Sequence, residues 1–277
     1  MAAQYAGLGL LCGGAAALAL AGWLARRNGI AWQHTAWIGA LALASALVLL
    51  PVLRAQAAWL AWALPAGNLY VTAGFAVIPP LLYCLARRLN LALLADVWAP
   101  AVLLLLAGAR VDCFLRGCCW GDVCCDPALL APVLDAGAHW QVYTVPAVCG
   151  AGWPLAVTFP YGSPAHMQHV VLGMFTAPST SSLPCHPVQL YEAAGTVIVA
   201  LGLLMAWPRR RFPLQIWCGA VGWYSTLRFV MEFMRADHPA VWCGLTMVQV
   251  ISLCMLAIAL ACSCVARRTA AVKYSHT

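Results

Sequence analysis

Long apolar segments, separated for the most part by short connections, run through the 277 residues of the chain. An α-helix needs about 20 predominantly apolar residues to cross the hydrocarbon core of a bilayer. Seven segments approach that length, namely Ala6–Leu24, Trp37–Leu53, Leu69–Leu85, Leu91–Ala109, Leu190–Trp207, Leu214–Met231 and Leu245–Val265. This pattern predicts an all-α polytopic membrane protein with about seven transmembrane helices, folded as a single membrane domain over residues 1–277.

One connection is much longer than the others. Residues 111–186, between the fourth and fifth apolar segments, contain aromatic residues and prolines but no stretch long enough to span a membrane. Loops of more than about 15 residues are usually either functional or disordered. Because this connection is apolar and rich in cysteine, we expect it to fold as a small cap.

Basic residues lie at the ends of the apolar segments and predict the orientation of the chain. If the segments alternate in direction, four clusters fall on the same side: Arg26 with Arg27, Arg87 with Arg88, Arg209 to Arg211, and Arg267 and Arg268 with Lys273. Arg and Lys are enriched in cytoplasmic connections. The N-terminus and the cap are therefore predicted to be extracytoplasmic, and the C-terminus cytoplasmic. Asp96, in the first third of the fourth segment, is expected to pair with Arg87 or Arg88 near the inner face.

Composition supports a membrane protein and argues against nucleic-acid binding. Hydrophobic residues make up 64% of the chain and charged residues 8%, whereas soluble domains carry about 25% charged residues. The net charge of +7 comes from basic residues scattered at segment ends, which fits a bias toward the inner leaflet. The lipid bilayer is the expected surrounding, and no nucleic acid is expected as a partner.

The chain has 14 cysteines, and several belong to the predicted cap or border it. These are Cys113, Cys118, Cys119, Cys124, Cys125, Cys149 and Cys185, with Cys243 expected on the same side. An extracytoplasmic location favours disulfides that hold the cap together, for example between the Cys118–Cys125 group and Cys149 or Cys185. A soft-metal site is the alternative, since paired thiolates suit such ions. The doubled cysteines do not match a C-x-x-C ribbon, and no metal is assigned from the sequence.

Polar residues interrupt the apolar pattern at three places, and the first is Gly108–Gly121. Arg110, Asp112 and Arg116 stand there among cysteines and glycines, directly after the fourth apolar segment. A charged side chain at the centre of a bilayer costs about 2.5–3.5 kcal/mol on insertion scales. Arg110 either snorkels to the interface at an ordinary helix end or belongs to a site for a lipid head group or substrate.

The second polar cluster opens the fifth segment and consists of His186, Gln189, Tyr191 and Glu192. An ordinary helix start can explain these residues, because a carboxylate suits the helix dipole at that end and tyrosine suits a membrane interface. A group of His, Gln and Glu at a membrane face also fits a binding site.

The third cluster is a stripe along the sixth segment, formed by Tyr224, Arg228, Glu232 and Arg235. Spacings of four, four and three place these residues on one face of a helix. Arg228 and Glu232 can form a structural ion pair, or the two arginines can present a fork to a phosphate.

The seventh segment carries Thr246, Gln249 and Ser252 on a similar stripe. Residues of this kind are expected to make hydrogen bonds between helices. In the alternating arrangement, Arg110, the turn at His186 and the Arg228 stripe lie near the same outer face. They predict one cavity between helices, open to lipid and covered by the cap, which is the default location for a functional site.

The residues of the three clusters resemble the signature motifs of the prolipoprotein diacylglyceryl transferases. The matching motifs are Gly108-Ala109-Arg110-x-x-Cys113-Phe114-Leu115-x-Gly117-x-x-Trp120-Gly121, His186-Pro187-x-Gln189-Leu190-Tyr191-Glu192 and Arg228-Phe229-x-x-Glu232-Phe233-x-Arg235-x-Asp237. By this resemblance Arg110, Gly121, Arg228 and Glu232 correspond to functional positions of the family. The resemblance also implies a location in the bacterial plasma (inner) membrane.

The chain departs from the family pattern at two positions. The asparagine that usually follows the first arginine by three residues is Cys113 here, as in Cys-rich members. Family members also carry a His-Gly-Gly at the start of the third span, whose histidine is thought to be catalytic. This chain has Thr72-Ala73-Gly74 instead.

The resemblance implies transfer of a diacylglyceryl group from phosphatidylglycerol to the lipobox cysteine thiol of a preprolipoprotein, without a cofactor. Arg110 and Arg228 are the candidates that stabilise charge on the phosphate, and Glu232 completes the catalytic set. Substrate contacts are expected from Gly121, His186, Gln189, Tyr191, Glu192, Tyr224 and Arg235. Without the usual histidine, Glu232, Glu192 or His186 is left as the base that deprotonates the thiol.

Two other functions stay open at this point. A relative that binds lipid or lipopeptide in the same cavity, without catalysis or with a different specificity, fits the absence of the histidine. A thiol-based metal or redox membrane protein fits the doubled cysteines.

Overall fold

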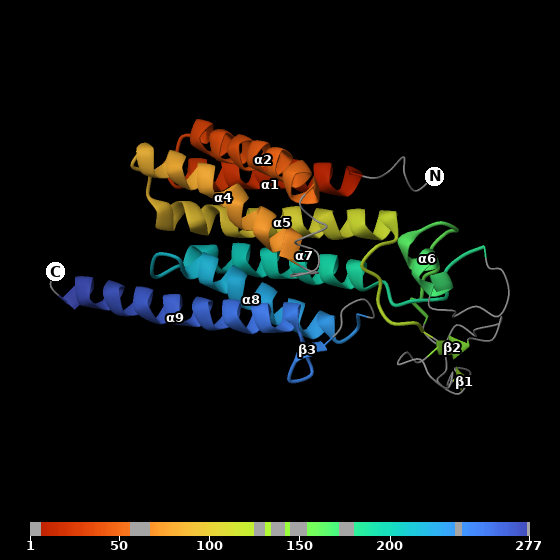
Figure 1. Ribbon diagram of the computed structural model, residues 1–277. Coiled ribbons are helices and arrows are strands. Elements are labelled where there is room, and N and C mark those ends of the chain that lie inside the picture. Colours follow the sequence, from red (N-terminus) through yellow and green to blue (C-terminus); the bar gives the residue numbers. More distant parts are fainter. Residues whose placement is uncertain are drawn as a thin grey trace.

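Seven long helices form the body of the computed structural model, which describes residues 7–55, 67–124, 131–133, 142–144, 154–171, 180–235 and 240–275. They are α1 (Leu8–Arg27), α2 (Trp32–Ala55), α4 (Gly67–Ala86), α5 (Leu91–Arg116), α7 (Val188–Ala206), α8 (Gln215–Glu232) and α9 (Met247–Ser275). The helices lie side by side as one bundle (Figure 1). Each predicted apolar segment lies mostly within one of them, so these helices are confirmed.

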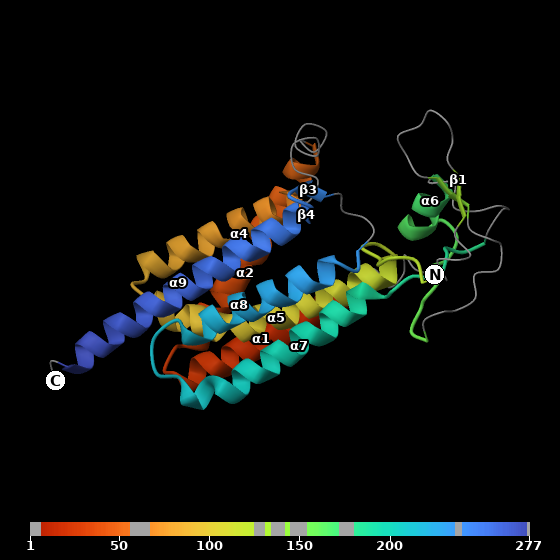
Figure 2. The same cartoon turned by 90° about the horizontal axis from the view of Figure 1, so that it is seen from below.

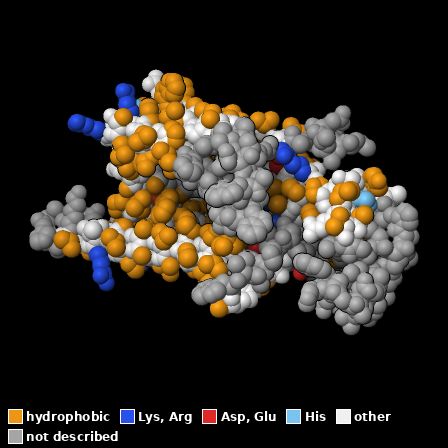
Figure 3. Space-filling model, viewed as in Figure 1, with side chains coloured by type: hydrophobic (Ala, Val, Ile, Leu, Met, Phe, Trp, Pro, Cys, Tyr) orange, Lys and Arg blue, Asp and Glu red, His pale blue; other side chains and the backbone are white. Residues whose placement is uncertain are grey.

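The surface of the bundle is that of a membrane protein. Among the residues that the structure describes, four stretches are long and apolar enough to cross a bilayer: Leu8–Arg27, Leu91–Arg116, Val188–Arg209 and Met247–Val272. Leu43, Leu82, Ile198 and Leu260 are each more than half exposed, and apolar side chains cover much of the described face in Figure 3. Soluble proteins rarely expose apolar surface of this extent, so we infer that lipid covers it.

Successive helices alternate in direction, so α1 begins and α9 ends at opposite ends of the bundle (Figures 1 and 2). The end at which α1, α4, α7 and α9 finish is called the basic end here, because Arg side chains project from it (Figure 3). There Arg27 stacks on Trp23 at 4.2 Å, and Arg210 stacks on Trp207, in the short helix η3 (Trp207–Arg209), at 4.9 Å. The opposite end, beside α6, is called the α6 end.

Helix α5 is the centre of the bundle and packs against α1, α7 and α8. On one side, Val97 and Ala101 pack against a row of small residues in α1. On another side, Leu103 packs with Ala200 of α7 and Ile216 of α8. Helix α9 covers α8, and α2 joins α4 to α1.

Glycines let α1 and α5 approach each other closely. Gly9 and Gly13 are four residues apart in α1, and they face Gly108 of α5. A Cβ atom at Gly108 would overlap the backbone oxygen of Gly9 and lie 2.8 Å from the Cα of Gly13. Small residues four apart are a common means of close helix packing in membranes. Here Gly108, at the contact, lies two residues before Arg110 in α5.

We predict that Gly108→Ala destabilises the protein by about 1–3 kcal/mol, because overpacking at a backbone contact forces the two helices apart. Unfolding by denaturant in detergent micelles measures the change. Gly14→Ala is the matched control, since a Cβ there would meet only a side-chain carbon of Leu105 at 3.8 Å. Equal stability of the two variants would show that the helices do not touch at Gly108.

Asp96 corrects one expectation from the sequence. It is fully buried in α5, and its Oδ1 accepts a hydrogen bond from the backbone N–H of Trp217 at 3.0 Å. Its Oδ2 lies 3.4 Å from Nη1 of Arg210. The expected pairing with Arg87 or Arg88 is wrong, because the connection between α7 and α8 packs over this part of α5. The first turn of α8 also offers a positive dipole end to the carboxylate.

Helix α5 is longer than the apolar pattern predicts. It continues past Ala109 to Arg116 and ends at Gly117, whose φ is 67°. Asp112, in this added part, accepts a hydrogen bond from the N–H of Gly7 at 2.6 Å, and so it binds the N-terminal end of α1. Its other oxygen pairs with Arg116 at 2.8 Å. Arg110 is therefore a helical residue with a full turn of helix after it.

Small elements occupy the α6 end. They are β1 (Ala131–Val133) paired antiparallel with β2 (Val142–Thr144), helix α6 (Pro164–Val171), and β3 (Ala240–Trp242) paired with β4 (Leu245–Thr246). Trp120, Phe159, Ala165 and Cys185 form an apolar cluster under α6. This cluster anchors the described part of the long connection to the residues that follow α5.

His169 of α6 is buried in the same region. Its Nδ1 accepts a hydrogen bond from the N–H of Leu183 at 3.3 Å. Burial lowers the pKa of His169 from 6.5 to about 4, with a smaller contribution from nearby His166. The folded segment thus holds the neutral imidazole.

We predict that this segment opens as the pH falls from about 6.5 toward 4, because the unfolded segment binds a proton that the folded one excludes. The population of the open form should rise up to about tenfold per pH unit in this window. Amide hydrogen exchange of α6 measures it. His169→Asn keeps an acceptor and does not titrate, so its exchange should lack this dependence; the same acid response in that variant would contradict the assignment.

Candidate active site

The three polar motifs meet at the α6 end through their backbones. The N–H of Gly121 donates to the carbonyl oxygen of His186 at 3.0 Å, and the N–H of Asp122 donates to that of Met234 at 2.9 Å. Gly121 also forms an antiparallel bridge with Arg235. The structure therefore brings together the motifs that the sequence places at one face.

Gly121 is the point of closest approach in this junction. A Cβ atom there would overlap the side chain of Val188 and lie 2.7 Å from the oxygen of Met234 and 2.8 Å from the Cβ of His186. Only glycine fits between the two other motifs at this distance. Its geometry explains why a glycine is needed here.

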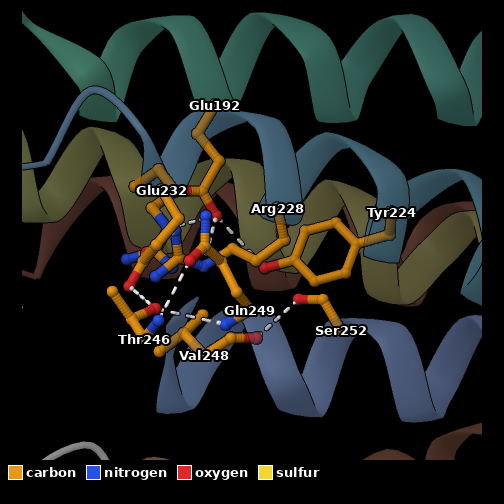
Figure 4. Close-up of polar contacts among 9 residues, drawn as sticks. Glu192, Tyr224, Arg228, Glu232, Thr246, Val248, Gln249 and Ser252 are labelled. Atoms are coloured by element: carbon orange, nitrogen blue, oxygen red, sulfur yellow. Dashed lines mark hydrogen bonds and ion pairs between the residues drawn. The ribbon is translucent and has the colours of Figure 1, made fainter. Parts of the chain in front are cut away.

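Glu192 is the centre of the polar cluster inside the bundle. The side chain comes from the first turns of α7 and is 1% exposed. Its Oε1 lies 2.9 Å from Nε of Arg110 and 3.7 Å from Nε of Arg228, and it accepts a hydrogen bond from the Tyr224 hydroxyl at 3.2 Å. Figure 4 shows Glu192 pointing from α7 toward Arg228, with Tyr224 beside them. The sequence predicts Glu192 as a substrate contact or a base, with an ordinary helix start as the alternative, and the structure places it at the centre of the cluster.

Arg228 also pairs with Glu232, one turn further along α8. Its Nη1 lies 2.9 Å from Oε2 of Glu232, so the predicted ion pair is confirmed. The hydroxyl of Thr246 donates to Oε1 of Glu232 at 2.8 Å (Figure 4). Glu232 thereby joins α8 to the start of α9.

Thr246 and Gln249 have a role that the sequence analysis missed. Thr246 Oγ1 accepts a hydrogen bond from the N–H of Gln249 at 3.2 Å, and Gln249 Oε1 accepts one from the N–H of Thr246 at 2.9 Å. This is a reciprocal capping box at the start of α9. Its signal in a sequence is a Thr followed three residues later by a Gln, directly before an apolar run. The expected hydrogen bond between helices is confirmed for Thr246, whereas the hydroxyl of Ser252 bonds to Val248 within α9.

The charges of the cluster balance within the bundle. Arg110 and Arg228 supply two positive charges, and Glu192 and Glu232 supply two negative ones. An unpaired ion in an apolar interior costs several kcal/mol, so each group needs its partners. The Arg110 side chain is 14% exposed and that of Arg228 is 6% exposed, which makes Arg110 the more accessible of the two guanidinium groups.

Gln189, His186 and Tyr191, which the sequence also predicts as site residues, lie where the start of α7 meets the turn after α5. Gln189 donates from Nε2 to the carbonyl oxygen of Cys118 at 2.7 Å and ties α7 to the turn after α5. The rings of His186 and Tyr191 lie 6.5 Å apart at the backbone junction. Asp237 lies outside the described residues, and Thr72-Ala73-Gly74 lie within α4.

Cysteines gather next to the site. The Sγ atoms of Cys113, Cys118 and Cys119 all lie within 4.8 Å of one another. These three, together with Cys124, Cys185 and Cys243, are free thiols, so the disulfides favoured by the compartment are not formed among the described cysteines. Cys125 and Cys149 lie outside the described residues. Burial raises the pKa of the Cys185 thiol to about 12, with a smaller contribution from Cys124.

The fold and the site together define a class of protein: an integral membrane protein that holds arginines, carboxylates and a tyrosine from several helices in one buried cluster. The profile of the prolipoprotein diacylglyceryl transferase family matches residues 3–265. The chain belongs to this family, as the motifs predict. Membership and the apolar helices indicate a protein of the bacterial inner membrane.

Similar proteins have the name phosphatidylglycerol–prolipoprotein diacylglyceryl transferase. One from Xanthomonas oryzae pv. oryzae is 32% identical over 145 residues, which cover 48% of this chain and 45% of the relative. One from Azoarcus sp. is 32% identical over 90 residues (30% and 34%), and one from Nitrobacter winogradskyi is 33% identical over 116 residues (40% and 34%). The chain spans about half the length of the Xanthomonas relative and about a third of the other two.

We predict that Thr246→Val destabilises the protein by about 1–2 kcal/mol, because it removes the cap of α9 and the hydroxyl bound to Glu232. Denaturant unfolding in micelles measures the effect. Thr246→Ser keeps the hydroxyl and should stay close to wild type. Thr226→Val is the matched control, since that exposed hydroxyl bonds only to Gly222 within α8. If both valine variants lose the same stability, Thr246 does not link the helices.

Proposed function

We propose that the protein transfers the diacylglyceryl group of phosphatidylglycerol to the lipobox cysteine of a preprolipoprotein. The observation that carries the proposal is the convergence of Arg110 and Arg228 on one buried carboxylate, Glu192. Two guanidinium groups from different helices that share an acceptor can also share the oxygens of a phosphate diester. Family membership supports the same reaction.

The phosphate of phosphatidylglycerol takes the place of Glu192 as the partner of the arginines. Arg110 is the first contact, because it is the more accessible of the pair. Arg228 is held from its other side by Glu232, so it is already oriented when the lipid binds. As glycerol phosphate leaves, negative charge grows on it, and fixed guanidinium groups stabilise that charge.

Glu192 is the strongest of the three candidate bases. Its Oε2 is buried and has no hydrogen-bond partner among the described residues. Glu232 is engaged by Arg228 and Thr246, and His186 lies at the backbone junction. When the phosphate draws the arginines away, the Glu192 carboxylate is released to accept the thiol proton, which produces the nucleophilic thiolate.

In the bond-making step, the cysteine sulfur forms a bond to the terminal glyceryl carbon of the diacylglyceryl group. The bond between that carbon and the phosphate oxygen breaks, and its electron pair leaves with glycerol phosphate. The thiol proton passes to the carboxylate. The products are a thioether and glycerol phosphate, and the atoms balance without a cofactor.

The membrane setting that we propose has all seven long helices crossing the bilayer, with an extracytoplasmic N-terminus and a cytoplasmic basic end. Residues 111–186 then form a cap over the site, within a single domain that covers the chain. Gly121, His186, Gln189, Tyr191, Tyr224 and Arg235 line the approach of the two substrates. The lipid enters from the bilayer and the lipobox peptide from beneath the cap.

A second function deserves a test because Thr72-Ala73-Gly74 replaces the family's histidine motif. In this alternative the protein binds the lipid or the lipopeptide at the same cluster of residues without transferring the diacylglyceryl group. The arginine cluster serves both functions equally well, so only turnover separates them.

We predict that the wild-type chain restores growth to a strain depleted of its diacylglyceryl transferase, and that Arg228→Ala and Arg110→Ala do not. Removal of one group that stabilises the leaving charge should lower the rate about 100- to 1000-fold. Glu192→Gln should lose a similar factor if it is the base. Mass spectrometry of a lipobox peptide incubated with phosphatidylglycerol and the purified protein measures these rates.

Arg209→Ala is the matched control, because Arg209 is an exposed residue at the basic end, where α7 finishes, whereas Glu192 lies near the start of α7. It should restore growth fully. A wild-type chain that reaches the membrane at a normal level, binds phosphatidylglycerol and shows no turnover would exclude the transferase and establish the binding function.

A further inference from the structure

The end of α5 brings two cysteines together. The N–H of Gly117 donates to the oxygen of Phe114 at 3.0 Å, and the N–H of Cys118 donates to the oxygen of Cys113 at 3.1 Å. These two bonds, with Gly117 in the left-handed region, form a Schellman motif, which places the residue after the glycine against the residue five positions earlier. The side chains of Cys113 and Cys118 are thus held face to face by the backbone.

The third thiol comes from Cys119, which has an unusual backbone. Its φ is 60°, a conformation that costs a non-glycine residue about 1 kcal/mol or more and tends to occur at functional sites. Gln189 holds the preceding residue through its hydrogen bond to the oxygen of Cys118. The strained turn returns the Cys119 thiol to within 4.8 Å of the other two sulfurs.

Two positive charges lie close to the cluster. The guanidinium groups of Arg235 and Arg110 are near enough to Cys119 to interact with a negative charge on its sulfur.

We propose that Cys113, Cys118 and Cys119 form a binding site for a soft, thiophilic metal ion, and that the three-sulfur set fits Cu(I). Metal–sulfur bonds of about 2.3 Å in a trigonal site place the sulfurs about 4 Å apart, so sulfurs within 4.8 Å need to close by less than about 1 Å. Soft thiolate ligands select Cu(I), whereas structural zinc requires four ligands. Within the described part of the chain, the group has three ligand residues.

Binding converts the thiols into thiolates, and their protons pass to water. Charge then builds up beside Arg235 and Arg110, which offset it. The three sulfur ligands are distinct from the groups of the phosphate site, although Arg110 lies near both. The metal site does not require that the proposed transferase activity exist.

The full-length protein, purified in micelles without oxygen, tests the proposal by titration with Cu(I) against the chromophoric chelator bathocuproine disulfonate. The variant with Cys113→Ser, Cys118→Ser and Cys119→Ser should bind one equivalent less than wild type. The matched control carries Cys124→Ser, Cys185→Ser and Cys243→Ser, three cysteines outside the cluster, and should keep that equivalent. Equal binding by the cluster variant and wild type would overturn the proposal.

Two further measurements keep the test decisive if the triple variant folds poorly. X-ray absorption of the Cu(I)-loaded wild type should show three sulfur ligands at about 2.3 Å, and the single variant Cys118→Ser should show two. Thiol labelling of the protein isolated without reductant should modify all three cysteines. A disulfide between any two of them would refute the metal site. Because none of these measurements uses turnover, a failure here leaves the transferase proposal untouched.

Discussion

A buried carboxylate held between two guanidinium groups is the interaction on which this structure depends. Glu192 is almost inaccessible, and its Oε1 contacts Arg110 and Arg228. An ion in an apolar bundle must be paired, so the position of each of these side chains requires the other two. Because they come from α7, α5 and α8, the pairing fixes three helices relative to one another. Glu232 and the capping residue Thr246 extend the same network to α9.

This constraint is also what gives the site its chemistry. Arginines that are already gathered around a carboxylate are arranged for a phosphate, which has the same charge and a similar set of acceptor oxygens. The backbone also approaches closely on two sides of this network. Gly108 permits contact with α1, and Gly121 permits contact with the motifs at His186 and Arg235. A side chain at Gly108 would push α1 away from α5, and one at Gly121 would push the other two motifs away.

The extension of α5 beyond its apolar run connects the polar cluster to the thiol cluster. Arg110 and Cys113 are three residues apart on the same helix, and residues at this spacing share a face. The Schellman turn after Arg116 then brings Cys118 back against Cys113. One helix end therefore carries both a guanidinium group of the phosphate site and the first ligand of the proposed metal site, and Gln189 of α7 braces the turn between them.

The sequence by itself determined the seven helices, the gathering of their basic residues at one end of the bundle and the pairing of Arg228 with Glu232. These features are local, because hydrophobic length and a spacing of four residues are properties of one segment. It also singled out the three motifs, but it did not indicate which of their side chains contact one another. Only the tertiary structure decided that Glu192 is the shared acceptor, that Asp96 pairs with Arg210 instead of Arg87 or Arg88, and that three thiols meet beside Arg110. Such contacts join different helices or depend on how a helix ends, and they follow from the packing and rotation of whole elements, which apolar periodicity does not specify.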